Sequence, residues 1–302
     1  MIRKGATMLH SPAVWMPEEL AEAWKLIQHL ELKSQLIAGG TFLQTYWQKG
    51  LAFPTHLISL ERVKELQGWG KELVNGERFT RIGALTKLTD FRKIAMLKKE
   101  VSLLDKACRS IAAPAIRNQA TIGGNIATGL GDTIPALLAL DAQLSVFDGE
   151  GYHLHSVSDY IKNLDSLSYS ILVSIYLPDK TTARKTNYFY QKLGLREAFS
   201  PSVVTIAGCC TLDEQLRVEH IRLAVGGGSA IAQRLRRSEQ LLSGSSLSNQ
   251  LLTGVVQAIK GEFNPRTDIF SSAEYKRTVA ANLLVSELVR LTGSEEGGDT
   301  RL

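Results

Sequence analysis

Two glycine pairs, far apart in the sequence, have the clearest capacity for chemistry. One lies in Ala38-Gly39-Gly40-Thr41-Phe42-Leu43 and the other in Thr121-Ile122-Gly123-Gly124-Asn125. A glycine lets the backbone turn where a Cβ would clash, and it lets a ligand approach the main chain closely. Successive N–H groups in such a turn form a concave anion site. Two such loops could hold one diphosphate between them, although a single Gly-Gly pair is more often a simple turn.

The sequence indicates no other reactive site. It has neither G-x-x-x-x-G-K-[ST] nor a G-x-G-x-x-G after a predicted strand, so neither a P-loop nor a Rossmann site is predicted. His153 and His155 could share a strand face, but no third metal ligand stands nearby. Cys108, Cys209 and Cys210 form no C-x-x-C pair and indicate buried, reduced thiols. We therefore predict no catalytic residue and no metal ligand, and expect a bound cofactor to bring the reactivity.

Composition narrows the class of protein further. The chain has 302 residues, 44% of them hydrophobic and 22% charged, which suits a globular protein of two domains. The net charge of +5 is dispersed, so a nucleic-acid partner is not predicted. No apolar run approaches the ~18 residues that a membrane-spanning helix needs. The N-terminus lacks the apolar core of a signal peptide, which predicts a cytoplasmic protein.

The glycine pairs need elements to position them. Residues 1–57 read as a β-α-β-β unit, in which a strand at 36–38 runs directly into the first pair. Strands at 79–84, 143–147, 152–157 and 171–177, with helices between them, form a second unit over residues 58–178. A short apolar helix follows Asp132 and Thr133.

The pattern changes after Pro178. Strands are predicted at 188–193, 203–212 and 216–225, and helices at 233–242, 250–260 and 273–291. Strands followed by helices indicate an α+β domain. We therefore predict domains at 1–178 and 179–292, the second with a three-stranded antiparallel sheet, and a flexible tail at 293–302.

Residues 111–127, with the sequence IAAPAIRNQATIGGNIA, resemble the signature of the FAD-binding medium subunit of molybdenum hydroxylases. This family includes subunits of the xanthine dehydrogenase and carbon monoxide dehydrogenase type. Ala38-Gly39-Gly40-Thr41 is similar to the second flavin loop of that family, and residues 132–142 and 272–277 also fit. The similarities occur in the family's order along most of the chain.

The resemblance implies an α+β fold, in which a two-subdomain FAD-binding domain of the vanillyl-alcohol-oxidase type precedes a smaller α+β domain. The subdomains would be residues 1–57 and 58–178, with FAD between them and its diphosphate held by the two glycine loops. The implied cofactor-binding residues are Ala38, Gly39, Gly40, Thr41, Phe42, Leu43, Thr121, Ile122, Gly123, Gly124, Asn125, Asp132, Tyr190 and Lys192.

Some of these assignments have structural alternatives. Asp132 could instead cap the helix that follows Thr133. Tyr190 could cover a flavin ring face and Lys192 could stabilise negative charge on reduced flavin, or both could belong to an ordinary aromatic strand edge. Phe42 stands where relatives commonly carry a polar residue such as Asp, which leaves backbone contacts possible but puts a side-chain contact in doubt.

The resemblance also implies a function. The chain would pass electrons from the [2Fe–2S] small subunit through FAD to NAD⁺ or another acceptor, beside a molybdopterin-binding large subunit. Two alternatives stay open: a stand-alone flavin oxidoreductase of the same cofactor fold, and a non-catalytic nucleotide-binding assembly module. The substrate of the complex and its stoichiometry do not follow from this chain.

Overall fold

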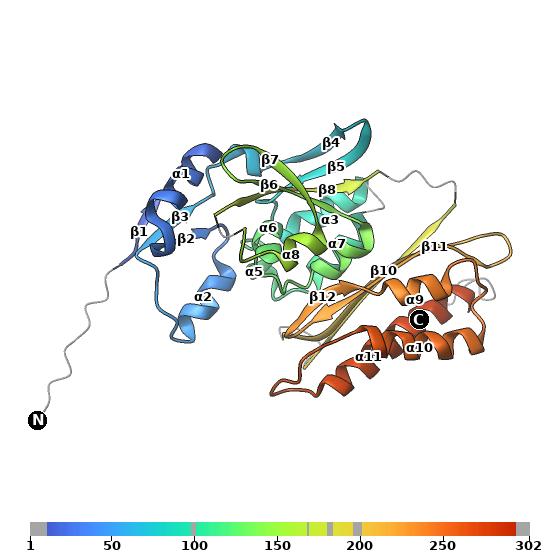
Figure 1. Cartoon of the computed structure of the whole chain (residues 1–302). Coiled ribbons are helices and arrows are strands. Elements are labelled where there is room, and N and C mark those ends of the chain that lie inside the picture. Colours follow the sequence, from blue (N-terminus) through green and yellow to red (C-terminus); the bar gives the residue numbers. More distant parts are fainter. Residues whose placement is uncertain (1–10, 98–100, 168, 180–183, 196–200, 294–302) are drawn as a thin grey trace, which may run out of the picture.

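The structure is a computed structural model that describes residues 11–97, 101–167, 169–179, 184–195 and 201–293. Three sheets follow one another along the chain (Figure 1). The first is a parallel sheet with the strand order β1-β3-β2. Its strands are β1 (Ala13–Trp15), β2 (Ser34–Ile37) and β3 (His56–Ser59), and its helices are α1 (Leu20–Leu30), η1 (Glu31–Lys33) and α2 (Thr41–Gln48).

Helix α1 forms because its apolar residues recur at helical spacing and face one way. Leu20, Ala23 and Ile27 are buried on that face, in a core with Ile58 of β3. The first glycine pair lies directly between the end of β2 and the start of α2.

The second sheet is antiparallel, with the order β4-β5-β8-β6-β7. Its strands are β4 (Trp69–Val74), β5 (Glu77–Gly83), β6 (Gln143–Phe147), β7 (Tyr152–Ser156) and β8 (Ile171–Pro178). The helices of this region are η2 (Lys64–Leu66), η3 (Leu88–Asp90), α3 (Phe91–Leu97), α4 (Ser102–Arg109), α5 (Pro114–Arg117), α6 (Ile122–Ala127), α7 (Ile134–Leu140) and α8 (Val157–Lys162).

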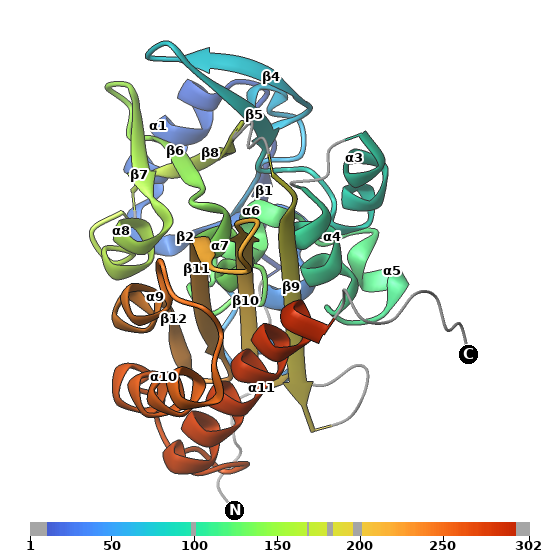
Figure 2. The ribbon, with the colours of Figure 1, turned by 90° about the vertical axis from the view of Figure 1, so that its right-hand side faces the viewer.

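The third sheet is also antiparallel, with the order β12-β11-β10-β9. Helices α9–α11 cover its outer face, and α7 lies on the opposite face (Figures 1 and 2). The elements are β9 (Thr186–Gly194), β10 (Ser202–Leu212), β11 (Val218–Gly227), β12 (Ala230–Arg234), α9 (Arg236–Leu242), α10 (Asn249–Glu262) and α11 (Ala273–Gly293).

Helix α7 joins the second and third sheets. All seven of its residues are buried, and it packs against β10 and β11. The sheet face beneath it carries small residues, Ala207, Ala224 and Ala232, which belong to the same core cluster as α7. An added Cβ on Gly226 would lie 3.2 Å from Cγ of Pro135. Small side chains therefore let the helix seat closely on the sheet, because interiors are packed without voids.

The structure confirms the α+β class but corrects three predicted details. The third sheet has four strands, not three, because Gly227 and Gly228 adopt positive φ and turn the chain back into β12. The predicted β-α-β-β unit lacked helix α2, and the helix predicted at 233–242 begins only at Arg236, because Gln233 and Arg234 belong to β12. Gly293 ends α11, and the rest of the predicted tail lies outside the described residues. The domain boundary at 178 stays a prediction.

Candidate functional site

The two glycine loops lie in contact. An ideal Cβ on Gly39 would fall 2.1 Å from the carbonyl oxygen of Gln119 and 3.1 Å from Cα of Ala120. Only a residue without a side chain allows this approach without displacing backbone. Gln119 and Ala120 directly precede Thr121, so the first loop lies against the start of the second.

The first loop presents an N-terminal helix turn. Gly40 has φ +68°, in the left-handed region, and serves as N-cap of α2. The first N–H groups of any α-helix lack intrahelical acceptors. Within the described part of the chain, the N–H groups of residues 39–43 donate no hydrogen bond. The first N–H that does is that of Gln44, which donates to Gly40 O at 3.0 Å. We name the following N–H groups the open amide row: those of Gly39, Gly40, Thr41, Phe42 and Leu43.

The open amide row borders a hollow of about 500 Å³. Trp47 and Phe53 stack at one side of it, with ring centroids 4.7 Å apart. A second hollow, of about 540 Å³, begins at Ala38 and is more polar, with Lys87, Lys93 and Trp69 in its lining. Unpaired N–H groups at the positive end of a helix dipole attract phosphate groups, so this loop is suited to a diphosphate with a larger group on either side.

The second loop is built differently. Gly123 and Gly124 lie in the first turn of α6, and neither has positive φ. Ile122 N donates to Thr86 O (3.0 Å), Gly123 N to Ala84 O (2.9 Å) and Gly124 N to Thr121 Oγ1 (3.1 Å). The expected concave row of exposed amides is therefore absent from these three residues, because the protein itself takes up their N–H groups.

Gly123 instead serves close packing. An added Cβ would lie 2.6 Å from Cβ of Ala84 and 2.8 Å from its carbonyl oxygen. The glycine thus lets α6 approach the segment that follows β5. This is a packing use of glycine, distinct from the left-handed turn at Gly40.

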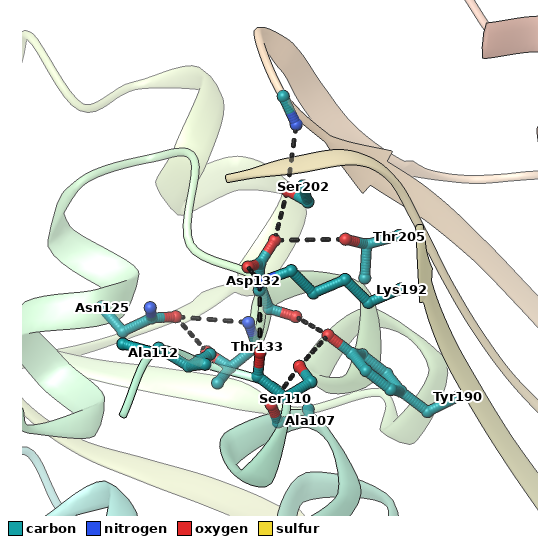
Figure 3. A network of polar contacts seen from close by, with 12 residues as sticks. Ala107, Ser110, Ala112, Asn125, Asp132, Thr133, Tyr190, Lys192, Ser202 and Thr205 are labelled. Carbon is teal, nitrogen blue, oxygen red and sulfur yellow. Dashed lines mark hydrogen bonds and ion pairs between the residues drawn. The ribbon is translucent and has the colours of Figure 1, made fainter. Parts of the chain in front are cut away.

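Asn125 offers the second loop's clearest side-chain donor. Its Oδ1 accepts hydrogen bonds from Thr133 N (3.2 Å) and Thr133 Oγ1 (2.6 Å) (Figure 3). An amide oxygen that accepts twice fixes which way the group points. Nδ2 is then directed away from Thr133.

Asp132, Tyr190 and Lys192, which the sequence places far apart, meet in one polar network (Figure 3). Oδ2 of Asp132 lies 2.8 Å from Nζ of Lys192. Oδ1 of Asp132 accepts from Ser202 Oγ (2.6 Å) and Thr205 Oγ1 (3.1 Å). The N-cap of α7 is Thr133, with no side-chain cap bond, so the helix-cap alternative for Asp132 is wrong. Its carboxylate binds the third sheet instead.

Tyr190 completes this network from β9. Its hydroxyl donates to Asp132 O (3.1 Å) and lies 3.1 Å from Ser110 Oγ. Burial, together with the nearby Asp132 carboxylate, raises the pKa of the Tyr190 hydroxyl well above its usual value. The hydroxyl therefore stays protonated and serves as a donor. Lys192 Nζ also donates to Ser110 O at 3.2 Å.

A strained segment adjoins Ser110. Ala112 has φ +43°, in a region that is unfavourable for a residue with a Cβ. Nη1 of Arg117 donates to Ile111 O (2.8 Å) and Ala112 O (2.5 Å). Such strain persists only where the surroundings hold it, and here Arg117 and Lys192 bind the segment's carbonyl groups.

Sequence reasoning missed the hydroxyl groups of this network and the use of Arg117. Ser110, Thr133, Ser202 and Thr205 are isolated serines and threonines with no distinguishing pattern. Arg117 lies inside the signature segment, but its acceptors become evident only from the fold.

This geometry, a loop–helix junction with unpaired N–H groups beside two hollows, suits a phosphate-bearing cofactor. Residues 8–180 match the family described as the FAD binding domain in molybdopterin dehydrogenase. Residues 190–290 match the CO dehydrogenase flavoprotein C-terminal domain. The chain therefore belongs to this family of FAD-binding medium subunits of molybdenum hydroxylases, and its cofactor is FAD.

Individual relatives agree over most of their length. The chain is 28% identical to the carbon monoxide dehydrogenase medium chain of Hydrogenophaga pseudoflava, covering 89% of this chain and 92% of the relative. It is 28% identical to the nicotine 6-hydroxylase medium subunit of Paenarthrobacter nicotinovorans (94% and 96% covered). It is 25% identical to the xanthine dehydrogenase FAD-binding subunit of Escherichia coli O157:H7 (87% and 91% covered).

A solved structure shows the same architecture. A chain of carbon monoxide dehydrogenase from Hydrogenophaga pseudoflava superposes with a TM-score of 0.82 at 25% identity, covering 92% of this chain and 96% of that one. No helix among the described residues is both long and apolar enough to cross a membrane.

Proposed function

We propose that this chain is the electron-transfer subunit of a multi-subunit molybdenum hydroxylase. Its partners would be a molybdopterin-binding large subunit and a [2Fe–2S] small subunit, and NAD⁺ would be the final acceptor. The names of the relatives support a subunit role, since they are a medium chain, a medium subunit and an FAD-binding subunit. Bound FAD can accept electrons singly and give up two together, which suits a chain between one-electron and two-electron partners.

The open amide row carries this proposal. It joins an unpaired helix N-terminus to a left-handed glycine and lies against the second loop through Gly39. In the proposal, these amides donate to the FAD diphosphate, and Asn125 Nδ2 donates from the second loop. The residues fit the cofactor, since the site offers several N–H donors beside hollows of about 500 and 540 Å³.

The proposed roles of Asp132, Tyr190 and Lys192 follow from their bonding. Asp132 faces the Lys192 ammonium at 2.8 Å, so the pair has no net charge while both groups are ionised. Lys192 would stabilise negative charge on the cofactor only if its ammonium contacts the cofactor and Asp132 at the same time. Tyr190 keeps its proton and fixes the backbone of Asp132, which holds this wall of the site still.

The test starts with the purified chain freed of any bound chromophore. Titration with FAD, ADP and riboflavin separates diphosphate recognition from ring recognition. Charge-assisted hydrogen bonds contribute about 1.5–3 kcal/mol each, so we expect riboflavin to bind at least about 100-fold more weakly than FAD. Equal affinity for riboflavin and FAD would contradict the role of the open amide row.

A second experiment tests the subunit role. Affinity purification from the native host should recover a molybdopterin-containing chain and an iron–sulfur chain together with this one. The complex, once reduced by its substrate, should reduce NAD⁺. Turnover of a small substrate by the isolated chain, without companions, would contradict the proposal and favour a stand-alone flavin oxidoreductase.

A further inference from the structure

Thr133 occupies an unusual place between the two domains. It is fully buried and is the N-cap of α7. A threonine at an N-cap ordinarily accepts a hydrogen bond from an N–H of the first helical turn. Here the side chain makes no such bond, and Oγ1 instead donates to Asn125 Oδ1 at 2.6 Å. The hydroxyl is thus committed to orienting Asn125 rather than to capping the helix.

The surrounding backbone is shaped around the same contact. An ideal Cβ on Gly131 would lie 2.2 Å from Asn125 Oδ1 and 2.3 Å from Asn125 O. Thr128 Oγ1 donates to Asn125 O at 2.8 Å. The segment from Thr128 to Thr133 therefore wraps closely around Asn125 and leaves it one orientation.

Asp132, the residue before Thr133, is held in place by side chains of the third sheet. Asp132 binds Lys192, Ser202 and Thr205, all from the third sheet, and Ser202 Oγ also accepts from Gly228 N (3.1 Å) (Figure 3). Two adjacent residues thus connect the third sheet to the second glycine loop. A shift of the Asp132 backbone would move Thr133, and with it the amide of Asn125.

We propose that Thr133 is a positioning residue for FAD binding: it orients Asn125 Nδ2 toward the cofactor, and the third sheet holds it in place through Asp132. This inference rests on the proposed FAD site and adds a residue that acts without touching the cofactor. The C-terminal domain thereby contributes to the affinity of a site formed mainly by the other domain.

The test is a double-mutant cycle read out as the Kd of FAD for the cofactor-free protein, with no turnover required. Thr133→Val keeps the size of the side chain but removes the donor. We expect the Kd to rise about 5-fold, the effect of one lost hydrogen bond of about 1 kcal/mol, because Thr133 N still donates to Asn125 Oδ1. Thr133→Ser keeps the hydroxyl and should bind FAD nearly as the wild type does.

Asn125→Ala supplies the second arm of the cycle. If Thr133 acts through Asn125, Thr133→Val has no further effect on the Kd in the Asn125→Ala background. Thr211→Val is the matched control, since Thr211 is also buried and its hydroxyl lies 3.0 Å from that of Thr186, outside this network. It should leave the Kd unchanged. Thermal unfolding of each cofactor-free variant verifies that it is folded.

The outcomes separate the two proposals. A wild-type chain that fails to bind FAD overturns the proposed function and this inference with it. A wild-type chain that binds FAD, with Thr133→Val raising the Kd equally in both backgrounds or not at all, overturns the inference alone. Should Thr133→Val fail to fold, Ser202→Ala tests the same connection from the third sheet, with a raised Kd expected only when Asn125 is present.

Discussion

The loop at Gly39 and Gly40 leaves its N–H groups unpaired within the described chain, whereas the loop at Gly123 and Gly124 uses them inside the protein. Gly40 needs glycine for its left-handed φ, and Gly39 needs it to touch Gln119. Gly123 needs it to pack on Ala84. In the proposed function, two similar-looking motifs therefore divide the work: one offers backbone donors to the cofactor, and the other supports that loop and contributes a side chain.

Gly39→Ala should raise the Kd of FAD more than any other variant described below, because its side chain would displace one loop from the other. Its Cβ would fall 2.1 Å from backbone oxygen, so one loop must move. Overpacking of this kind costs about 1–3 kcal/mol of unfolding free energy, and we expect the Kd of FAD to rise about 100-fold. Denaturant unfolding and FAD titration measure the two quantities.

The control for this variant is Gly254→Ala in α10, where an added Cβ meets nothing within 4 Å. A helical Gly→Ala change should stabilise the protein by about 0.5–1 kcal/mol and leave FAD binding intact. Wild-type affinity in Gly39→Ala would show that the contact between the loops does not shape the site.

Asn125→Asp tests the donor that the second loop contributes. The variant keeps Oδ1 as acceptor for Thr133 but replaces Nδ2 with a negatively charged oxygen. Repulsion from the diphosphate should raise the Kd of FAD about 10- to 100-fold, with little change in affinity for riboflavin. Equal effects on both ligands would place Asn125 away from the diphosphate.

Gly123→Ala tests whether Gly123 stabilises the fold or contributes to FAD binding. Its Cβ would clash with Ala84, so we expect the cofactor-free protein to lose about 1–3 kcal/mol of unfolding free energy. The folded fraction should bind FAD with a Kd within about tenfold of the wild type. A fully stable variant that no longer binds FAD would instead assign this glycine to the ligand.

Phe42→Ala should change the Kd of FAD least. Phe42 is 43% exposed, and its ring packs edge-on against Tyr46 with centroids 4.8 Å apart. Because the open amide row donates through backbone, the Kd of FAD should change less than about threefold. A tenfold rise would show that this side chain contributes directly to FAD binding.

Much of this arrangement could be predicted from the sequence. The glycine pairs and signature segment indicated the family and the first loop, and the resemblance pointed to Asp132, Tyr190 and Lys192. Helix α1 followed from the helical spacing of its apolar residues, and the long strands β10 and β11 followed from long apolar runs.

The rest depended on contacts between distant segments. The N–H of Gly123 donates a hydrogen bond to Ala84 O. The local sequence does not specify that these two residues lie together. The partners of Asp132 are single hydroxyl residues on another sheet, and such residues carry no periodic signal. Strand β12 is short and follows a turn of two left-handed glycines, so its last two residues, Gln233 and Arg234, were assigned to the following helix.

The most direct test of the division between the loops is amide hydrogen exchange of the folded protein with and without FAD. Exchange reports whether each N–H is hydrogen-bonded and how often it opens. We predict that the amides of residues 39–43 exchange rapidly without FAD and become protected with it, whereas those of residues 122–124 are protected in both states. Rapid exchange at 122–124 that slows only with FAD, or no change at 39–43, would contradict the account.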